Sequence, residues 1–271
     1  MALSLRDASA SGVGSESEGH ASVRLLGSFA LCVGADEHFP ALTTQKVVAL
    51  LALHGPAMSR LQIAGTLWPE KTDERALANL RSALWRLNSC GDLIVTSDAN
   101  HVTLRTDVSV DARELENRWA ELPGSSLDMC GVLEATRRWA AALLPGWYED
   151  WVVFERERLR QVQLLGLEAL ARALVTAGHP AEAVIAGLAA IAREPLRESA
   201  HRVVIEAHLA AGNVVEARRQ FQLCRDYLQD QLGVAPSPDL TAMVLVATRP
   251  ESGDAPATAQ VPRIRRFATD S

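Results

Sequence analysis

One internal repeat constrains the fold of this chain more than any other feature. The segment Ala-Gly-His-Pro-Ala-Glu-Ala at residues 177–183 recurs as Ala-Gly-Asn-Val-Val-Glu-Ala at residues 211–217, an offset of 34 residues. A glycine between two helices, with alanines where the helices cross closely, is typical of stacked helical hairpins with this period. Because two copies are fewer than the roughly three that such a stack needs, we expect the helices of residues 112–170 to complete it.

The composition narrows the class of protein and its compartment. Net charge is −6 and the pI is about 5.7, so any nucleic-acid binding must depend on a local basic patch. The scattered cysteines Cys32, Cys90, Cys130 and Cys224 indicate reduced thiols in a cytosolic protein. Since we find neither a signal-peptide pattern nor an apolar run of membrane-spanning length, we expect a cytoplasmic protein without a membrane partner.

The N-terminal third alternates between strand-like and helical patterns. It begins with a β-like stretch at 23–33 and a second short strand near His38–Phe39. Three helices follow: one that Thr43 or Thr44 caps and that stops at Gly55-Pro56, a short one at 60–67 capped by Ser59, and one from Thr72 or Asp73 to about Ser89. A β-hairpin at 93–104 comes last. Strands, three helices and a hairpin in this order predict a winged helix-turn-helix whose hairpin is the wing.

From Asp111 onward almost every segment reads as helix, interrupted by Pro and Gly. We therefore expect a mainly α fold with a small β component, in which the winged helix-turn-helix precedes an all-α, tetratricopeptide-like repeat domain. The predicted divisions are a disordered tail at 1–20, the winged helix at 21–110, the repeat domain at 111–248 and a second disordered tail at 249–271.

The third expected helix carries the strongest functional signal. Its apolar stripe comprises Leu77, Leu80, Leu84 and Leu87. The opposite face carries Arg75, Asn79, Ser82, Trp85, Arg86 and Ser89, with Arg81 at the flank. Between residues 75 and 86 there are three arginines and no acidic residue. Such a face suits the major groove, because Arg can bind guanine and Asn can bind adenine in bidentate fashion.

Two observations temper this reading. Any exposed helix face is polar, and residues 21–115 contain nine basic against ten acidic residues, so a single copy should bind DNA only modestly. A dimer or a partner would compensate. Trp85 is too apolar to be left in water; it either packs beneath the wing, which we favour, or contacts thymine methyl groups.

Other candidate side chains are better explained by structure than by chemistry. His201 and His208, near Glu206, have too few converging ligands for a metal site, so we interpret them as structural. Trp147, Tyr148 and Trp151 could line a groove, but a place in the core is favoured. Residues 155–158, Glu-Arg-Glu-Arg, are predicted to form a solvated face. Neither a catalytic arrangement nor a phosphate-binding loop is recognisable, so we expect no enzyme activity and no cofactor.

With these elements placed, the chain resembles the SARP family, the antibiotic regulatory proteins of actinomycetes, over residues 23–247. The motifs that carry the resemblance to a response-regulator-type winged helix are Val-Arg-Leu-Leu-Gly-Ser-Phe at 23–29, Gln-Lys-Val-Val-Ala-Leu-Leu-Ala-Leu at 45–53, Leu-Trp-Pro at 67–69 and Ala-Asn-Leu-Arg-Ser-Ala-Leu-Trp-Arg-Leu at 78–87. Those that resemble a bacterial transcriptional activator domain are Leu-Pro-Gly-Trp-Tyr-Glu-Asp-Trp at 144–151, Glu-Arg-Glu-Arg-Leu at 155–159 and Leu-Gly-Val-Ala-Pro-Ser-Pro-Asp-Leu at 232–240.

The resemblance implies a transcription activator that binds direct repeats in double-stranded DNA as a side-by-side dimer. It also implies recruitment of RNA polymerase through the sigma factor and the α subunit, control of an antibiotic biosynthetic cluster, and a cytoplasmic, nucleoid-associated location. Since no GxxxxGK[ST] motif is found, the resemblance is to the small form of the family, without an ATPase module. The rival hypothesis is a helical-repeat module that senses a ligand or a protein and does not bind DNA specifically.

The resemblance also assigns roles to particular residues. The third helix would enter the major groove, with Arg81, Trp85 and Arg86 as base or phosphate contacts. The remaining DNA candidates are Asn79, Ser82, Arg75, Thr44 and Lys46, and Asn100 and His101 on the wing. The turn formed by Trp68, Pro69, Glu70, Lys71, Thr72 and Asp73 is the candidate polymerase contact.

Overall fold

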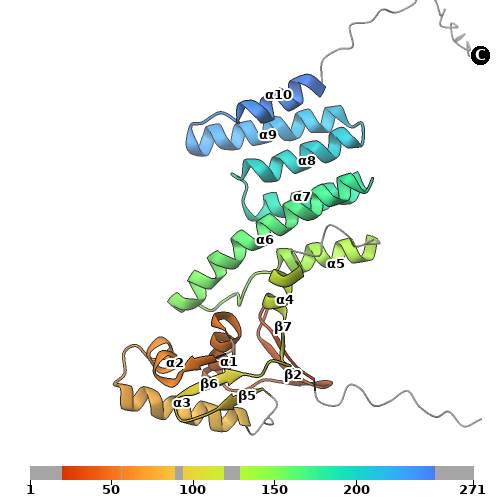
Figure 1. The fold of residues 1–271 in the computed structure, drawn as a ribbon. Helices are drawn as coiled ribbons and strands as arrows, with labels where there is room; N and C mark the ends of the chain where they lie inside the picture. The colour runs from red at the N-terminus through yellow and green to blue at the C-terminus, as the bar shows by residue number, and fades with distance from the viewer. Residues whose placement is uncertain (1–19, 56, 89–93, 119–128, 248–271) are drawn as a thin grey trace, which may run out of the picture.

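The computed structural model describes residues 20–55, 57–88, 94–118 and 129–247. The predicted tails lie outside these residues apart from His20, as do Ser89, Cys90 and the side chain of Cys130. The fold is mainly α with a small β component, as predicted. Figure 1 shows a winged helix-turn-helix at one end of the molecule and a stack of helices, α5 to α10, at the other.

A small sheet opens the chain. Strands β1 (Ala21–Arg24), β2 (Ala30–Val33) and β3 (Asp36–His38) are antiparallel, and β7 (Ser109–Val110) joins β1 in parallel, giving the order β3-β2-β1-β7. The prediction of one β-like stretch over 23–33 was wrong, because the chain turns away after Arg24 to bond with a distant segment. Gly27, at φ +83°, makes the return to β2 possible.

The winged helix itself follows the predicted order. Its elements are α1 (Leu42–His54), β4 (Ala57–Ser59), α2 (Arg60–Leu67), α3 (Asp73–Asn88), β5 (Val95–Ser97) and β6 (His101–Leu104). The wing hairpin β5–β6 is extended by β4, which the sequence did not predict, into a sheet of order β4-β6-β5.

The two predicted helix caps have opposite outcomes. Ser59 caps α2 in a capping box. Its hydroxyl accepts a hydrogen bond from the backbone amide of Gln62 at 3.1 Å, and the side-chain oxygen of Gln62 accepts one from the backbone amide of Ser59 at 3.0 Å. Helix α1, by contrast, begins at Leu42 after Ala41 with no side-chain cap. Thr44 lies inside the first turn with its side chain buried, so the predicted threonine cap was wrong.

The second half of the chain is helical. Its elements are α4 (Asp111–Arg118), α5 (Met129–Ala140), α6 (Asp150–Thr176), α7 (Pro180–Arg193), α8 (Glu198–Ala210), α9 (Val214–Leu232) and α10 (Pro238–Ala247). Helices α5 to α10 pack on one another in sequence, whereas α4 packs on β1, β7 and α1. Of the helices between residues 112 and 170, α5 and α6 therefore extend the stack. The predicted domain boundaries stay predictions.

The 34-residue repeat is confirmed down to its hydrogen bonds. The His179 amide donates to the Leu174 carbonyl at 2.8 Å, and 34 residues later the Asn213 amide donates to the His208 carbonyl at 2.8 Å. The turn glycines, Gly178 and Gly212, have φ of +83° and +73°, a region in which side chains cause strain. The same turn thus reverses the chain between α6 and α7 and between α8 and α9.

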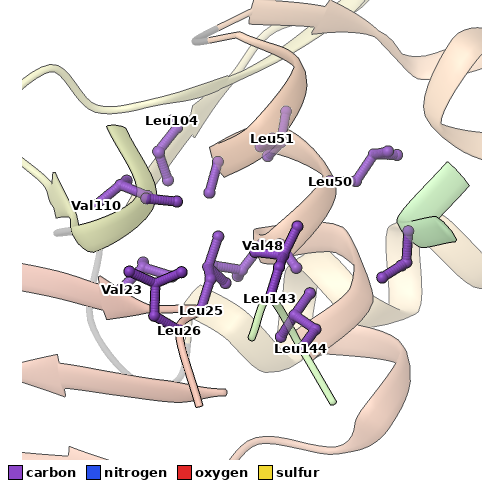
Figure 2. Packing of buried hydrophobic residues seen from close by; sticks show 14 of the residues in the cluster. Val23, Leu25, Leu26, Val48, Leu50, Leu51, Leu104, Val110, Leu143 and Leu144 are labelled. Atoms are coloured by element: carbon purple, nitrogen blue, oxygen red, sulfur yellow. The ribbon is translucent and has the colours of Figure 1, made fainter. Parts of the chain in front are cut away.

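One continuous core joins the winged helix to the helical stack (Figure 2). Val48 of α1 packs with Leu143 and Leu144, which lie between α5 and α6, and with Leu25 and Leu26, which follow β1. All five are buried. Burial of such side chains contributes roughly 1.5–3 kcal/mol each, so the two halves stabilise one another.

Backbone hydrogen bonds reinforce this junction. The Gly27 amide donates a hydrogen bond to the Ala142 carbonyl at 2.8 Å, and the Leu144 amide donates one to the Leu25 carbonyl at 2.9 Å. The Arg156 guanidinium donates to the carbonyls of Leu143, Leu144 and Trp147 at 2.8–3.0 Å. The interpretation of residues 155–158 as a solvated face was therefore wrong for Arg156, which holds the segment that enters α6.

Asp111, the first residue of α4, completes the junction. Its carboxylate accepts hydrogen bonds from the Leu25 and Leu26 amides at 2.8 and 3.0 Å, which supplies partners for two donors that the strand ladder leaves unpaired. Burial raises the pKa of Asp111 above its ordinary value, although the two amides and Arg138 oppose that shift.

We expect Asp111→Asn to destabilise the protein by about 1–3 kcal/mol. Asparagine keeps one side-chain oxygen as an acceptor but replaces the other with an NH₂ group, so one of the two backbone amides loses its acceptor. A carboxyl whose pKa is raised on folding contributes most stability at low pH and loses it as pH rises through the folded pKa. The stability difference between wild type and variant should therefore shrink from pH 3 to pH 7, as measured by urea unfolding. A difference that grows with pH would contradict the raised pKa.

Two glycines provide a matched test of helix packing. A methyl group at Gly166 in α6 would lie 2.0 Å from the Trp139 ring, whereas one at Gly65 in α2 meets nothing within 4 Å. We expect Gly166→Ala to destabilise the protein by about 1–3 kcal/mol through overpacking, despite alanine's higher helix propensity. Gly65→Ala should instead stabilise it by about 0.5–1 kcal/mol. Thermal melting of both variants tests these expectations. Equal melting temperatures for Gly166→Ala and Gly65→Ala would contradict the close contact between Gly166 and Trp139.

Candidate nucleic-acid interface

Helix α3 has one buried and one exposed face. Its buried residues are Ala76, Leu80, Ala83, Leu84 and Leu87. Leu77, predicted for this stripe, is only half-buried, and the two alanines take part instead. The helix packs through these residues against α1 and α2. The predicted buried side of the helix is thus confirmed for Leu80, Leu84 and Leu87, and corrected for Leu77.

The outward face of α3 is the candidate reading surface. Its exposed residues are Arg75, Ala78, Asn79, Arg81, Ser82, Trp85 and Arg86. The helix's own acids, Asp73 and Glu74, lie in its first turn, where they suit the positive end of the helix dipole. The Ser82 hydroxyl donates to the Ala78 carbonyl at 3.0 Å and keeps acceptor capacity toward solvent. The face therefore presents guanidinium and amide donors without a carboxylate between them.

Trp85 lies on this face with 75% of its surface exposed. Our favoured interpretation, that it packs beneath the wing, was therefore wrong. Leu84 and Leu87 share the core with Val102 and Leu104 of the wing strand β6, so apolar side chains already fill that side of α3. Trp85 lies on the other side of the helix, because it follows the buried Leu80 by five residues, a rotation of about 140° around the helix axis.

A cleft of about 450 Å³ lies beside this face, between α2, α3 and the tip of the wing. It is lined by Ser59, Arg60, Leu61, Leu77, Arg81, Ala99 and Asn100. Arg60, which was not among the predicted site residues, brings a second guanidinium to the predicted Arg81 and Asn100. The signal was present in the sequence, since an arginine directly after a helix cap lies at the start of a helix, where anions bind.

The wing tip is held in place from two sides. The Arg60 amide donates to the Asn100 carbonyl at 2.8 Å, and the Arg60 guanidinium donates to the Asp98 carbonyl at 2.9 Å. The Asp98 carboxylate accepts hydrogen bonds from the Asn100 and His101 amides, both at 2.7 Å, and these bonds lower the pKa of Asp98. Asn100 and His101 remain exposed. The wing thus presents them from a turn that is tied to α2.

Thr44 and Lys46 do not join this surface. The Thr44 side chain is fully buried, so its hydroxyl has no route to a phosphate. Lys46 forms an ion pair with Glu149, the residue that precedes α6. The predicted phosphate contact is therefore corrected for Thr44, while that of Lys46 stays a prediction for a side chain that is 25% exposed.

The turn between α2 and α3 is a separate exposed feature. Pro69, Glu70, Lys71, Thr72 and Asp73 are exposed, and Trp68 is half-buried. The Lys71 amide donates to the Trp68 carbonyl at 3.0 Å, and the Ala76 amide donates to the Thr72 carbonyl at 2.9 Å. The turn is therefore ordered, and its charged side chains lie at the end of α3 that is remote from Trp85.

Of the remaining candidates, His201 and Trp151 are packed inside the fold, whereas Tyr148 is exposed. His201 is buried; its Nε2 donates to the Pro195 carbonyl at 2.8 Å, its Nδ1 accepts from the Gln220 amide at 2.7 Å, and burial lowers its pKa, so the ring is neutral. Trp151 belongs to the core, as favoured, but Tyr148 is 83% exposed, so the core interpretation was wrong for Tyr148. Within the residues described, none of the helices is long and apolar enough to cross a membrane.

Comparison with known proteins agrees with this architecture. Residues 128–245 match the family model of the bacterial transcriptional activator domain. The chain is 29% identical over 204 residues to the Regulatory protein AfsR of Streptomyces coelicolor, which covers 72% of this chain and 20% of that protein. It is 28% identical over 209 residues to the Regulatory protein AfsR of Streptomyces griseus, covering 73% of this chain and 21% of that one. The chain thus spans about a fifth of the length of these relatives.

A solved structure shares the fold. Mycobacterium tuberculosis EmbR, in complex with a low affinity phosphopeptide, superposes with a TM-score of 0.67 at 18% identity, over 86% of this chain and 67% of that one. Fold and domain match together define a winged-helix protein that carries a bacterial transcriptional activator domain. Over most of its length the chain is similar to the Regulatory protein AfsR. Both curated relatives are named as regulators.

Proposed function

We propose that this protein binds double-stranded DNA sequence-specifically through α3 and the wing, and activates transcription. The observation that carries the proposal is the outward face of α3, which has no acidic residue from Arg75 to Arg86 and lies beside a cleft to which Arg60 and Arg81 contribute guanidiniums. Arginine side chains can bind guanine edges or phosphates, and Asn79 can bind adenine. The match to the bacterial transcriptional activator domain and the similarity to the Regulatory protein AfsR support the same function.

The charge balance favours binding by more than one copy. Residues 21–115 have a slight excess of acids, so one head neutralises few phosphates. Two protomers side by side on a direct repeat would double the phosphate and base contacts without a new site on the protein. We therefore propose a direct-repeat operator and a dimer on DNA, as the family resemblance implies.

The turn at residues 68–73 is our candidate contact for RNA polymerase, through its sigma factor or α subunit. Its exposed charges lie beyond the outward face of α3, so a second protein can reach them while DNA occupies that face. The regulated genes, by the same resemblance, form an antibiotic biosynthetic cluster.

The direct test is an affinity measurement on promoter fragments from the neighbourhood of the gene, at about 50 and about 200 mM salt. A complex with about six phosphate contacts should lose roughly 10³-fold in affinity between these conditions. Weak binding that does not respond to salt would instead favour the rival function, a ligand-sensing or protein-binding repeat module.

Arg81→Ala should weaken operator binding by about 1–3 kcal/mol, the cost of one bidentate base contact, with an unchanged melting temperature. Arg219→Ala is the matched control, because Arg219 is an exposed arginine on α9, far along the chain from the winged helix, and pairs only with Glu216 in the described part of the chain. Fluorescence anisotropy with labelled DNA measures both. Wild-type affinity in Arg81→Ala would reject the assignment.

Glu70→Ala and Lys71→Ala should reduce transcription without reducing DNA affinity, because both side chains are exposed on the turn and remote from Trp85. In-vitro transcription beside a binding assay measures the two effects separately. Asp36→Ala, at the exposed first residue of β3, serves as the control. Parallel losses in binding and transcription would count against a polymerase contact.

A further inference from the structure

Trp85 is the most prominent apolar side chain on the outward face of α3. It is 75% exposed, and two neighbours on the same side of the helix, Ser82 and Ala78, are small, while the third, Arg81, is a long cation. These small residues allow the helix backbone to approach a surface closely, while the indole projects beyond it. Among the residues that the structure describes, no aromatic ring stacks on Trp85.

An indole in this position has a specific chemical preference. It offers a broad apolar surface and a single N–H donor, and it has no acceptor. In the major groove, thymine presents a methyl group and, beside it, the O4 acceptor. Cytosine presents an amino donor at the corresponding place and no methyl group. Adenine also presents an amino donor. Thymine is therefore the base whose edge matches both properties of the indole.

The cations beside Trp85 complement such a contact. Arg81 lies one turn before it and Arg86 directly after it, so phosphates or guanines bound by these arginines would hold the indole over the base edges. Arg81 also lines the cleft with Arg60 and Asn100, so this flank of α3 lies beside the tip of the wing.

We propose that Trp85 is a specificity-determining residue that reads a thymine in each half-site, by covering the 5-methyl group with its ring. This inference rests on the proposed function, since it names the base that the α3 face selects. It differs from that function in predicting sensitivity to one methyl group of the DNA.

The test uses wild-type protein and an operator located by footprinting. Each thymine in the footprint is replaced singly by deoxyuridine, which removes only the methyl group. At one thymine per half-site, affinity should fall about fourfold, the equivalent of about 0.8 kcal/mol for one buried carbon group. The other thymines should show little change.

Variants assign this effect to Trp85. Trp85→Gln should bind the unmodified operator about tenfold or more weakly and lose the deoxyuridine penalty at that thymine. Trp85→Phe, which keeps an apolar ring, should retain the penalty. Phe154→Ala, at an aromatic residue of α6 that is also 75% exposed, is the matched control and should behave as wild type.

The outcomes separate the two proposals. If wild type gives no footprint on any promoter fragment, the DNA-binding function itself fails. If a footprint forms but Trp85→Gln keeps wild-type affinity or the same deoxyuridine penalty, only the role of Trp85 is overturned. Loss of the penalty in Trp85→Phe would also overturn it. Melting curves of all variants confirm folding, and Trp85→Phe carries the test if Trp85→Gln melts early.

Discussion

The molecule depends on the junction at which residues 142–144 bond to residues 25–27. Two backbone hydrogen bonds, the buried side chains of Leu143 and Leu144, and the Asp111 carboxylate all act within this small region. Without it, the winged helix and the helical stack would each expose part of one shared core. With it, the direction in which α3 faces is fixed relative to the repeats.

The electrostatics of the head follow from how its charges are distributed. The protein is acidic in total, yet the outward face of α3 has no carboxylate between Arg75 and Arg86. Several acids of the head are already neutralised or hydrogen-bonded within the fold: Asp98 by the amides of the wing tip and Asp111 by those of the junction. A short-range, salt-sensitive patch can therefore exist on a protein whose net charge would repel DNA at long range.

Local patterns predicted the elements well and their long-range contacts poorly. The repeat, the Ser59 cap and the direction of α3 could be predicted, because each depends on residues within a few positions of one another. The splitting of residues 23–33 could not, because the partners of residues 25–27, Asp111, Ala142 and Leu144, lie at least 85 residues away. The pairing of Lys46 with Glu149 could not be predicted for the same reason. Arg156 was assigned to solvent although its carbonyl partners lie only 9–13 residues earlier, because they belong to the irregular segment before α6, whose path a helical pattern does not predict.

Helix α6 links the head to the stack. It is a single helix of 27 residues, about 40 Å long, whose first turns contribute to the junction core and whose last turns begin the repeats. A helix of this length resists bending, so it sets the spacing and angle between the distal repeats and α3. If two copies bind a direct repeat as proposed, the same rod would make both stacks lean the same way along the duplex.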